Sequence, residues 1–156
     1  QAKAQVDFDP SRVAGYRLLG YENRAVADRD FRNDSVDGGE IFAGHSSTAL
    51  YEVVLAPGAS GVALRATVRY VDAGGATVER SAQLSAEQTT AQLSRANRRL
   101  HQDVLIAMLT DRLMTGPWSG QLTAADLQAQ ADAVGGRVDG DAAVGELLGL
   151  IRRSRV

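Results

Sequence analysis

The chain has 156 residues, of which 44% are hydrophobic, enough for one core. Its formal charge of −2 and interspersed acidic and basic residues exclude a broad single-sign surface for nucleic acid or anionic lipid. The longest apolar run, 104–109, is far shorter than the ~20 residues of a membrane span, so we expect no membrane insertion. The lack of cysteine removes disulfides and thiolate chemistry.

Strand patterns dominate the beginning of the chain. Residues 4–8 alternate between small or apolar and polar side chains, and Asp9-Pro10-Ser11 predicts a turn after them. Residues 13–21 are rich in β-branched and aromatic side chains and predict a second strand. Residues 23–30 could form one or two helical turns, whereas the turn residues of 32–39 indicate an ordered loop.

Three further strands are predicted at 48–55, 62–71 and 76–84. The middle one has the clearest alternation, with apolar side chains at even positions from Val62 to Tyr70 and Arg65, Thr67 and Arg69 between them. Asp, Ala and two glycines at 72–75 predict a turn that joins it to the last strand as a hairpin.

Helical periodicity begins at Ser85. Ser85 and Gln88 have the spacing of a capping box, and apolar residues from Leu93 to Met108 predict one long helix that ends at Gly116-Pro117. We expect its second half, with Leu113, to be buried on more than one side.

Two shorter helices follow. Thr123 and Asp126 predict the start of the first, and Gly135-Gly136 its end. Asp139 or Asp141 caps the second, whose apolar stripe consists of Val144, Leu147, Leu148 and Ile151.

The order of these elements predicts an α+β fold. A small antiparallel sheet or open β-sandwich occupies 1–84, and a three-helix C-terminal subdomain occupies 85–156. Because short strands bury little surface alone, we expect the helices to complete a single module with the strands, 1–156.

Acidic residues gather in the loop that follows the second strand. Asp30, Asp34, Asp37 and Glu40 could supply oxygen ligands to calcium, although their spacing matches no EF-hand loop. The alternative, which we favour, is that these carboxylates cap helix ends, brace turns or pair with Arg17, Arg24 and Arg32.

The histidines do not complete a catalytic set. His45 stands beside two serines, but neighbouring strand residues point to opposite faces, so we interpret it as a hydrogen-bonded structural residue. His101 is expected on the solvated flank of the long helix. Trp118 is interpreted as a plug between helices. The expected structural polar cluster comprises Arg17, Glu22, Asn23, Arg24, Asp30, Asp34, Asp37, Glu40 and His45.

One long pattern resembles a known family. The run VDFDPSRVAGYRLLGYENR, continued by DFRNDSVDGGEI, AGH and TALYE, is similar to the C-terminal domain of bacterial von Willebrand factor type A domain-containing proteins. The resemblance covers 6–52 closely and the helices more loosely. The chain has no Asp-x-Ser-x-Ser motif, so the metal-binding A domain itself is not within it.

This resemblance implies an accessory module of unassigned function that supports adhesion or protein-complex assembly outside the cytoplasm. Because the sequence contains only isolated members of catalytic sets, we expect the module to be non-catalytic and to hold no cofactor. The implied partners are the A domain of the same polypeptide and a further protein. A calcium-stabilised adhesin module and a hydrolase are the alternatives. The resemblance also places an A domain upstream, so we expect the strand at 3–8 to run beside that domain or to continue into it. We also expect a sheet edge to self-associate when the A domain is missing.

Overall fold

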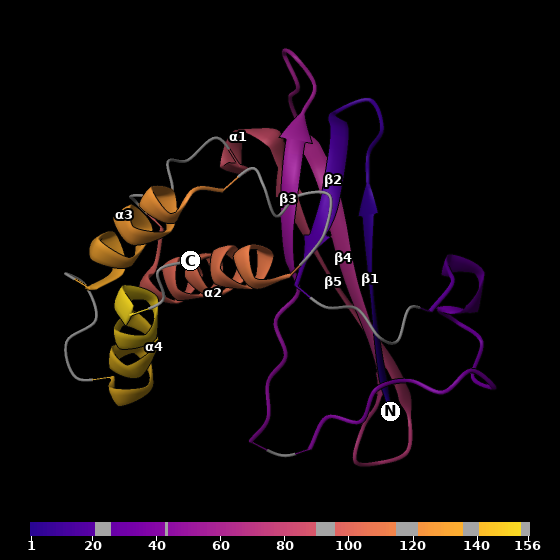
Figure 1. Cartoon of the computed structure of the whole chain (residues 1–156). Coiled ribbons are helices and arrows are strands. Elements are labelled where there is room, and N and C mark those ends of the chain that lie inside the picture. The colour runs from indigo at the N-terminus through magenta and orange to yellow at the C-terminus, as the bar shows by residue number, and fades with distance from the viewer. Residues whose placement is uncertain (21–25, 43, 90–95, 115–121, 136–140, 154–156) are drawn as a thin grey trace. The chain divides into compact units, whose positions relative to one another are not determined.

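The computed structural model describes residues 1–20, 26–42, 44–89, 96–114, 122–135 and 141–153. Its elements are β1 (Ala2–Phe8), β2 (Val13–Leu19), the 3-10 turn η1 (Asp28–Asp30), β3 (Leu50–Leu55), β4 (Val62–Val71), β5 (Thr77–Ser85), α1 (Ala86–Thr89), α2 (Arg98–Leu113), α3 (Ala124–Gly135) and α4 (Ala142–Arg153) (Figure 1). Antiparallel strands in the first half and helices in the second confirm the α+β class.

The chain divides into two compact units. We call the first, Gln1–Arg17 with Tyr21–Thr90, the strand unit. The second, Leu18–Gly20 with Ala91–Val156, is the helical unit.

The main sheet of the strand unit has the order β1-β4-β5, and both pairings are antiparallel. The predicted hairpin of β4 and β5 is confirmed, and its turn is held by Asp72, whose carboxylate accepts from the amides of Gly74 and Ala76 at 2.9 Å. Gly75 has a φ of 81°, a conformation that glycine adopts without strain. The alternation of apolar and polar residues at 62–71 predicted β4 with the bounds that the structure shows.

A second sheet consists of β2 and β3. It meets the main sheet through Phe8, whose ring stacks on Tyr16 of β2 at 3.9 Å between centroids and meets Tyr51 of β3 edge-on at 5.5 Å. Beside this contact lies a small core of Val13, Ala63 and Ala86, with Val53 and Leu55 packed against it.

The burial of β4 differs from that of a simple amphipathic strand. Its polar side includes Thr67, which is only 6% exposed, whereas Val62 and Val68 of the apolar side are 41% and 40% exposed. The alternation in the sequence predicts that the polar face of the sheet is exposed to solvent. In the structure, the loop that contains η1 is bonded to this polar face, so the face is partly covered.

The prediction of a single long helix starting at Ser85 was wrong. The predicted capping box is present, since the Ser85 amide donates to Gln88 Oε1 at 2.8 Å, but α1 spans only Ala86–Thr89. A new helix, α2, begins at Arg98, because the Asn97 side chain accepts from the Leu100 amide at 2.9 Å and caps it. Apolar spacing continues across this break and does not reveal it.

The helical unit buries one continuous core, in which α3 packs against both α2 and α4. Its buried members are Leu105, Leu127, Ala131, Val134, Val144, Leu148 and Ile151. The predicted caps of the two shorter helices are present: Thr123 and Asp126 bond reciprocally, and Asp141 accepts from the amides of Ala143 and Val144.

Two predictions for α2 require correction. His101 is 3% exposed, because its face of α2 turns toward α3, where Gln130 Nε2 lies 3.4 Å from His101 Nδ1. Leu113 is 62% exposed, so the end of α2 is not buried on several sides. Among the described residues, none of the helices is both long and apolar enough to cross a bilayer. Trp118 lies outside the described residues.

Candidate functional site

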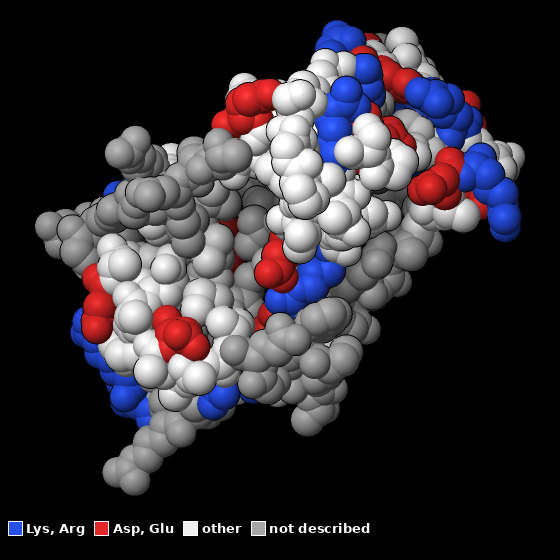
Figure 2. Space-filling view, turned by 90° about the horizontal axis from the view of Figure 1, so that it is seen from above, with Lys and Arg blue, Asp and Glu red and all other residues white. Residues whose placement is uncertain are grey.

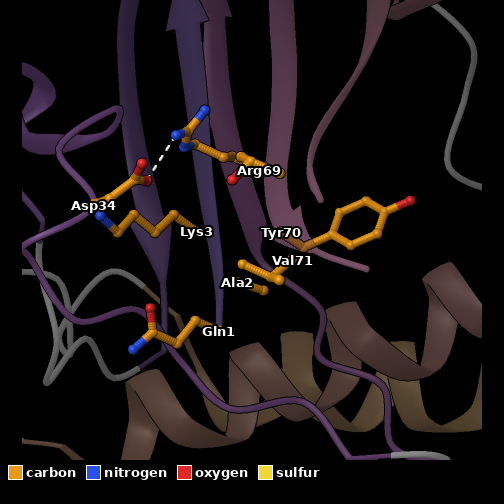
Figure 3. Close-up of a pocket in the computed structure, with 8 residues that line it drawn as sticks. Gln1, Ala2, Lys3, Asp34, Arg69, Tyr70 and Val71 are labelled. Atoms are coloured by element: carbon orange, nitrogen blue, oxygen red, sulfur yellow. Dashed lines mark hydrogen bonds and ion pairs between the residues drawn. The ribbon is translucent and has the colours of Figure 1, made fainter. Parts of the chain in front are cut away.

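The polar face of the main sheet brings together charged residues from distant parts of the chain. The strand registers place Lys3 of β1 opposite Arg69 of β4, and Arg69 opposite Glu79 of β5. Figure 3 shows Lys3 and Arg69 reaching toward Asp34, which belongs to the loop after η1. Three strands and one loop thus meet at this row.

Backbone contacts fix the loop to the edge of β1. The Ala2 amide donates to the Gly39 carbonyl at 2.7 Å, and the Gly39 amide returns a bond to the Ala2 carbonyl at 2.9 Å. Lys3 Nζ donates to the carbonyls of Asn33 at 2.6 Å and Asp30 at 3.3 Å. A lysine suits this position because its ammonium can satisfy several acceptors at once.

Ion pairs then connect the loop to β4 and β5. Arg69 donates to Asp34 at 2.7 Å and to Glu79 at 3.1 Å. Glu79 also accepts a two-pronged contact from Arg32, at 3.0 and 3.1 Å. We call Lys3, Arg32, Asp34, Arg69 and Glu79 the loop brace.

The pKa values of the two acids respond to these contacts. The hydrogen bond from Arg69 lowers the pKa of Asp34, and the bond from Arg32 lowers that of Glu79. Both carboxyls are therefore held in the charged form that accepts hydrogen bonds.

The contacts of the loop brace hold the loop against the polar face of the main sheet. Each charged group of the loop brace has an opposite charge or a carbonyl as partner. The small pocket beside Asp34 and Arg69 measures about 20 Å³, which is room for a water molecule.

The acidic residues singled out in the sequence have different environments. Asp34 belongs to the loop brace, whereas Asp37 accepts from Gln1 Nε2 at 2.8 Å, and Glu40 is exposed. The carboxylate of Asp30 lies 3.8 Å from Arg29. Within the described residues, no three His, Asp or Glu side chains gather in a way that could hold a metal ion.

The other members of the expected polar cluster lie elsewhere. Arg17 of β2 forms an ion pair with Glu52 of β3 and so links the two strands of the second sheet. Glu22, Asn23 and Arg24 fall outside the described residues. His45 is exposed, and its ring meets Phe42 edge-on at 6.0 Å between centroids.

A larger, open depression of about 390 Å³ lies where β1 ends and β4 begins. Its charged side chains are of both signs: Asp7 and Asp9 against Arg12 and Arg65. Arg12 forms an ion pair with Asp9, whose pKa is lowered chiefly by the hydrogen bond from Ser11. The face in Figure 2 likewise shows acidic and basic side chains next to one another, without a broad area of one sign.

Sequence reasoning missed Lys3, Arg69 and Glu79 as partners of the loop. A signal was available for two of them, because the predicted hairpin turn sets the register and places Arg69 opposite Glu79. No local pattern connects either residue to Asp34 or Arg32.

Comparison with known proteins gives one family and one curated relative. The family model described as "Uncharacterized protein YfbK, C-terminal" matches residues 1–93. The "Uncharacterized protein YfbK" of Escherichia coli (strain K12) is 47% identical over 53 residues, which are 34% of this chain and 9% of that protein. No solved structure matches.

The family match includes all strands, the loop brace and the exposed Ile41-Phe42 loop, and it ends between α1 and α2. The part shared with the family is therefore the strand unit, whereas α2, α3 and α4 lie beyond the match. Because the match covers more than half of the chain, the chain belongs to the family of YfbK C-terminal domains.

Proposed function

We propose that this chain is a non-catalytic interaction module of a larger bacterial protein, in which it docks onto a von Willebrand factor type A domain of the same polypeptide. The proposed role is adhesion or protein-complex assembly outside the cytoplasm. Support for the A domain and for the location comes from the resemblance of 6–52 to such proteins.

The observation that carries the proposal is a pair of exposed apolar side chains within the family match. Ile41 and Phe42 are 58% and 62% exposed. They follow directly on the braced loop, whose attachment at Gly39 fixes where they begin. Fully burying such side chains against a partner is worth roughly 1.5–3 kcal/mol each.

The polar residues support a non-catalytic role. The two acids of the loop brace are paired with its two arginines, Lys3 is bonded to backbone carbonyls, and the exposed ring of His45 contacts Phe42. A nucleophile with an adjacent base and an orienting third group would be needed for hydrolase chemistry.

The test compares two proteins that carry the same substitutions. Ile41→Ser with Phe42→Ser should leave the melting temperature of the 156-residue chain nearly unchanged, because both side chains are exposed. In the full-length protein, the same pair should lower the melting temperature, because the docked surface is lost. Leu150→Ser, at a 50% exposed position of α4, is the matched control and should affect neither. Equal melting of the wild-type and doubly substituted full-length proteins would reject the docking.

A further inference from the structure

Strand β5 is an edge of the main sheet. In an antiparallel pair, alternate residues exchange backbone hydrogen bonds with the partner strand, and the residues between them direct their amides and carbonyls outward. The Val71 amide donates to the Gln1 carbonyl and the Asp72 amide to the Ala76 carbonyl, so odd residues of β4 bond to β1 and even ones to β5. The outward groups of β5 therefore belong to Thr77, Glu79, Ser81 and Gln83.

The two edge strands of the main sheet, β1 and β5, differ in the hydrogen bonds of their outward backbone groups. At β1, both outward groups of Ala2 are bonded to Gly39. At β5, the contact recorded for an outward backbone group within the described residues is the bond from Arg80 to the Glu79 carbonyl, at 3.1 Å. Residues 80–83 are exposed. An edge of this length presents a template for another strand.

The side chains of β5 make it complementary to itself. In an antiparallel pair with a second copy, centred on Ser81, Val78 faces Leu84, Glu79 faces Gln83, and Arg80 faces Ala82. Like charges do not stand opposite each other, and the apolar residues at the two ends meet.

Other two-fold registers are less favourable. An axis at Glu79 or at Arg80 places that charge opposite its own copy, which is destabilising. An axis at Ala82 pairs only 79–85 and leaves Val78 without a facing residue on β5. The axis at Ser81 uses the whole strand.

We propose that β5 pairs with β5 of a second copy about a two-fold axis at Ser81, joining two main sheets edge to edge. This surface is separate from the Ile41-Phe42 loop and requires no A domain, so the inference goes beyond the proposed function. It differs also from association through β1, because the outward groups of Ala2 are already bonded.

A cross-linking test reads the register directly, because the chain has no native cysteine. Facing residues of a hydrogen-bonded antiparallel pair have Cα atoms ~5.5 Å apart, within disulfide range. Ser81→Cys should therefore form a disulfide dimer in mild oxidation, seen on a non-reducing gel. Ala82→Cys should not, because the two copies of residue 82 would be ~8 Å apart. Efficient cross-linking at 82 and not at 81 would overturn the register.

Charge variants test the same pairing in solution by sedimentation equilibrium. Ala82 faces Arg80 of the second copy. Ala82→Glu should therefore lower the dissociation constant of the dimer, and Ala82→Lys should raise it, each by about threefold or more. If the axis lay at Ala82, both variants would weaken the dimer.

A proline variant tests the backbone. Ser81→Pro removes an outward amide and leaves the hydrogen bonds to β4 in place, so the chain should still fold. The dissociation constant of its dimer should rise about tenfold. Ser81→Ala controls for the lost hydroxyl bond to Thr67, which measures 2.9 Å. A wild-type chain that stays monomeric up to millimolar concentration would overturn the proposal. Binding of a foreign peptide to this edge would not rescue the proposal in that case, because the proposed partner is a second copy of the chain.

Discussion

Replacing Gly38 by alanine tests how closely the loop approaches β1. A Cβ atom at Gly38 would lie 2.7 Å from the Ala2 carbonyl oxygen and 3.1 Å from its carbon, so the backbone must shift. That shift would break the two hydrogen bonds between Ala2 and Gly39, each worth about 0.5–1.5 kcal/mol net. We expect Gly38→Ala to lower the free energy of unfolding by about 1–3 kcal/mol, measured by urea denaturation.

The adjacent glycine supplies a matched control. A Cβ atom at Gly39 would come no closer than 3.8 Å to Ala2, and neither glycine has a positive φ. Gly39→Ala should therefore be neutral or slightly stabilising, because alanine restricts the unfolded chain. Equal denaturation midpoints for the two variants would show that the loop does not contact β1 as described.

Three further predictions concern the core, a helix cap and the loop brace. Leu127→Ala should destabilise the helical unit by about 2–5 kcal/mol, measured by circular dichroism in urea, whereas Leu150→Ala at an exposed position should cost far less. Thr123→Ala should cost about 0.5–2 kcal/mol by removing the cap of α3, and Thr123→Ser should retain most of the stability. Because the pKa values of Asp34 and Glu79 are lowered in the folded protein, their contribution is present above the ordinary values of 3.8 and 4.5 and is lost as pH falls through the folded ones. Combining Asp34→Asn with Glu79→Gln should flatten the acid side of the stability profile, and an unchanged profile would contradict the role of these pairs.

The strands were largely predictable because their signals are local. Ten alternating residues and a turn with two glycines define β4 and its hairpin without reference to the rest of the chain. The register of that hairpin also places Arg69 opposite Glu79.

The helices were predictable in type but not in every boundary. The capping pairs Thr123–Asp126 and Ser85–Gln88 are local and were found. The break before α2 depends on Asn97 capping a new helix while the apolar period runs on. The burial of His101 depends on where α3 packs, and no property of α2 alone determines it.

The candidate site was predictable only as a polar loop. The sequence indicated that acids in 30–40 would pair with arginines, and Asp34 does pair with one. That arginine is Arg69, on a strand whose alternation marks it as solvent-facing, so choosing it required the tertiary structure. Arg17 was expected near the loop but pairs with Glu52 across the second sheet.

The pairing of β1 with β4 sets the order in which the strand unit can form during synthesis. Phe8 and Ala2 pair with Leu64 and Tyr70, so β1 has no partner in the main sheet until β4 has left the ribosome. At about 5–20 residues per second, the wait is on the order of ten seconds. The loop brace must close later still, because Glu79 follows β4 in the chain, so the loop after η1 is fully attached only once β5 has been made.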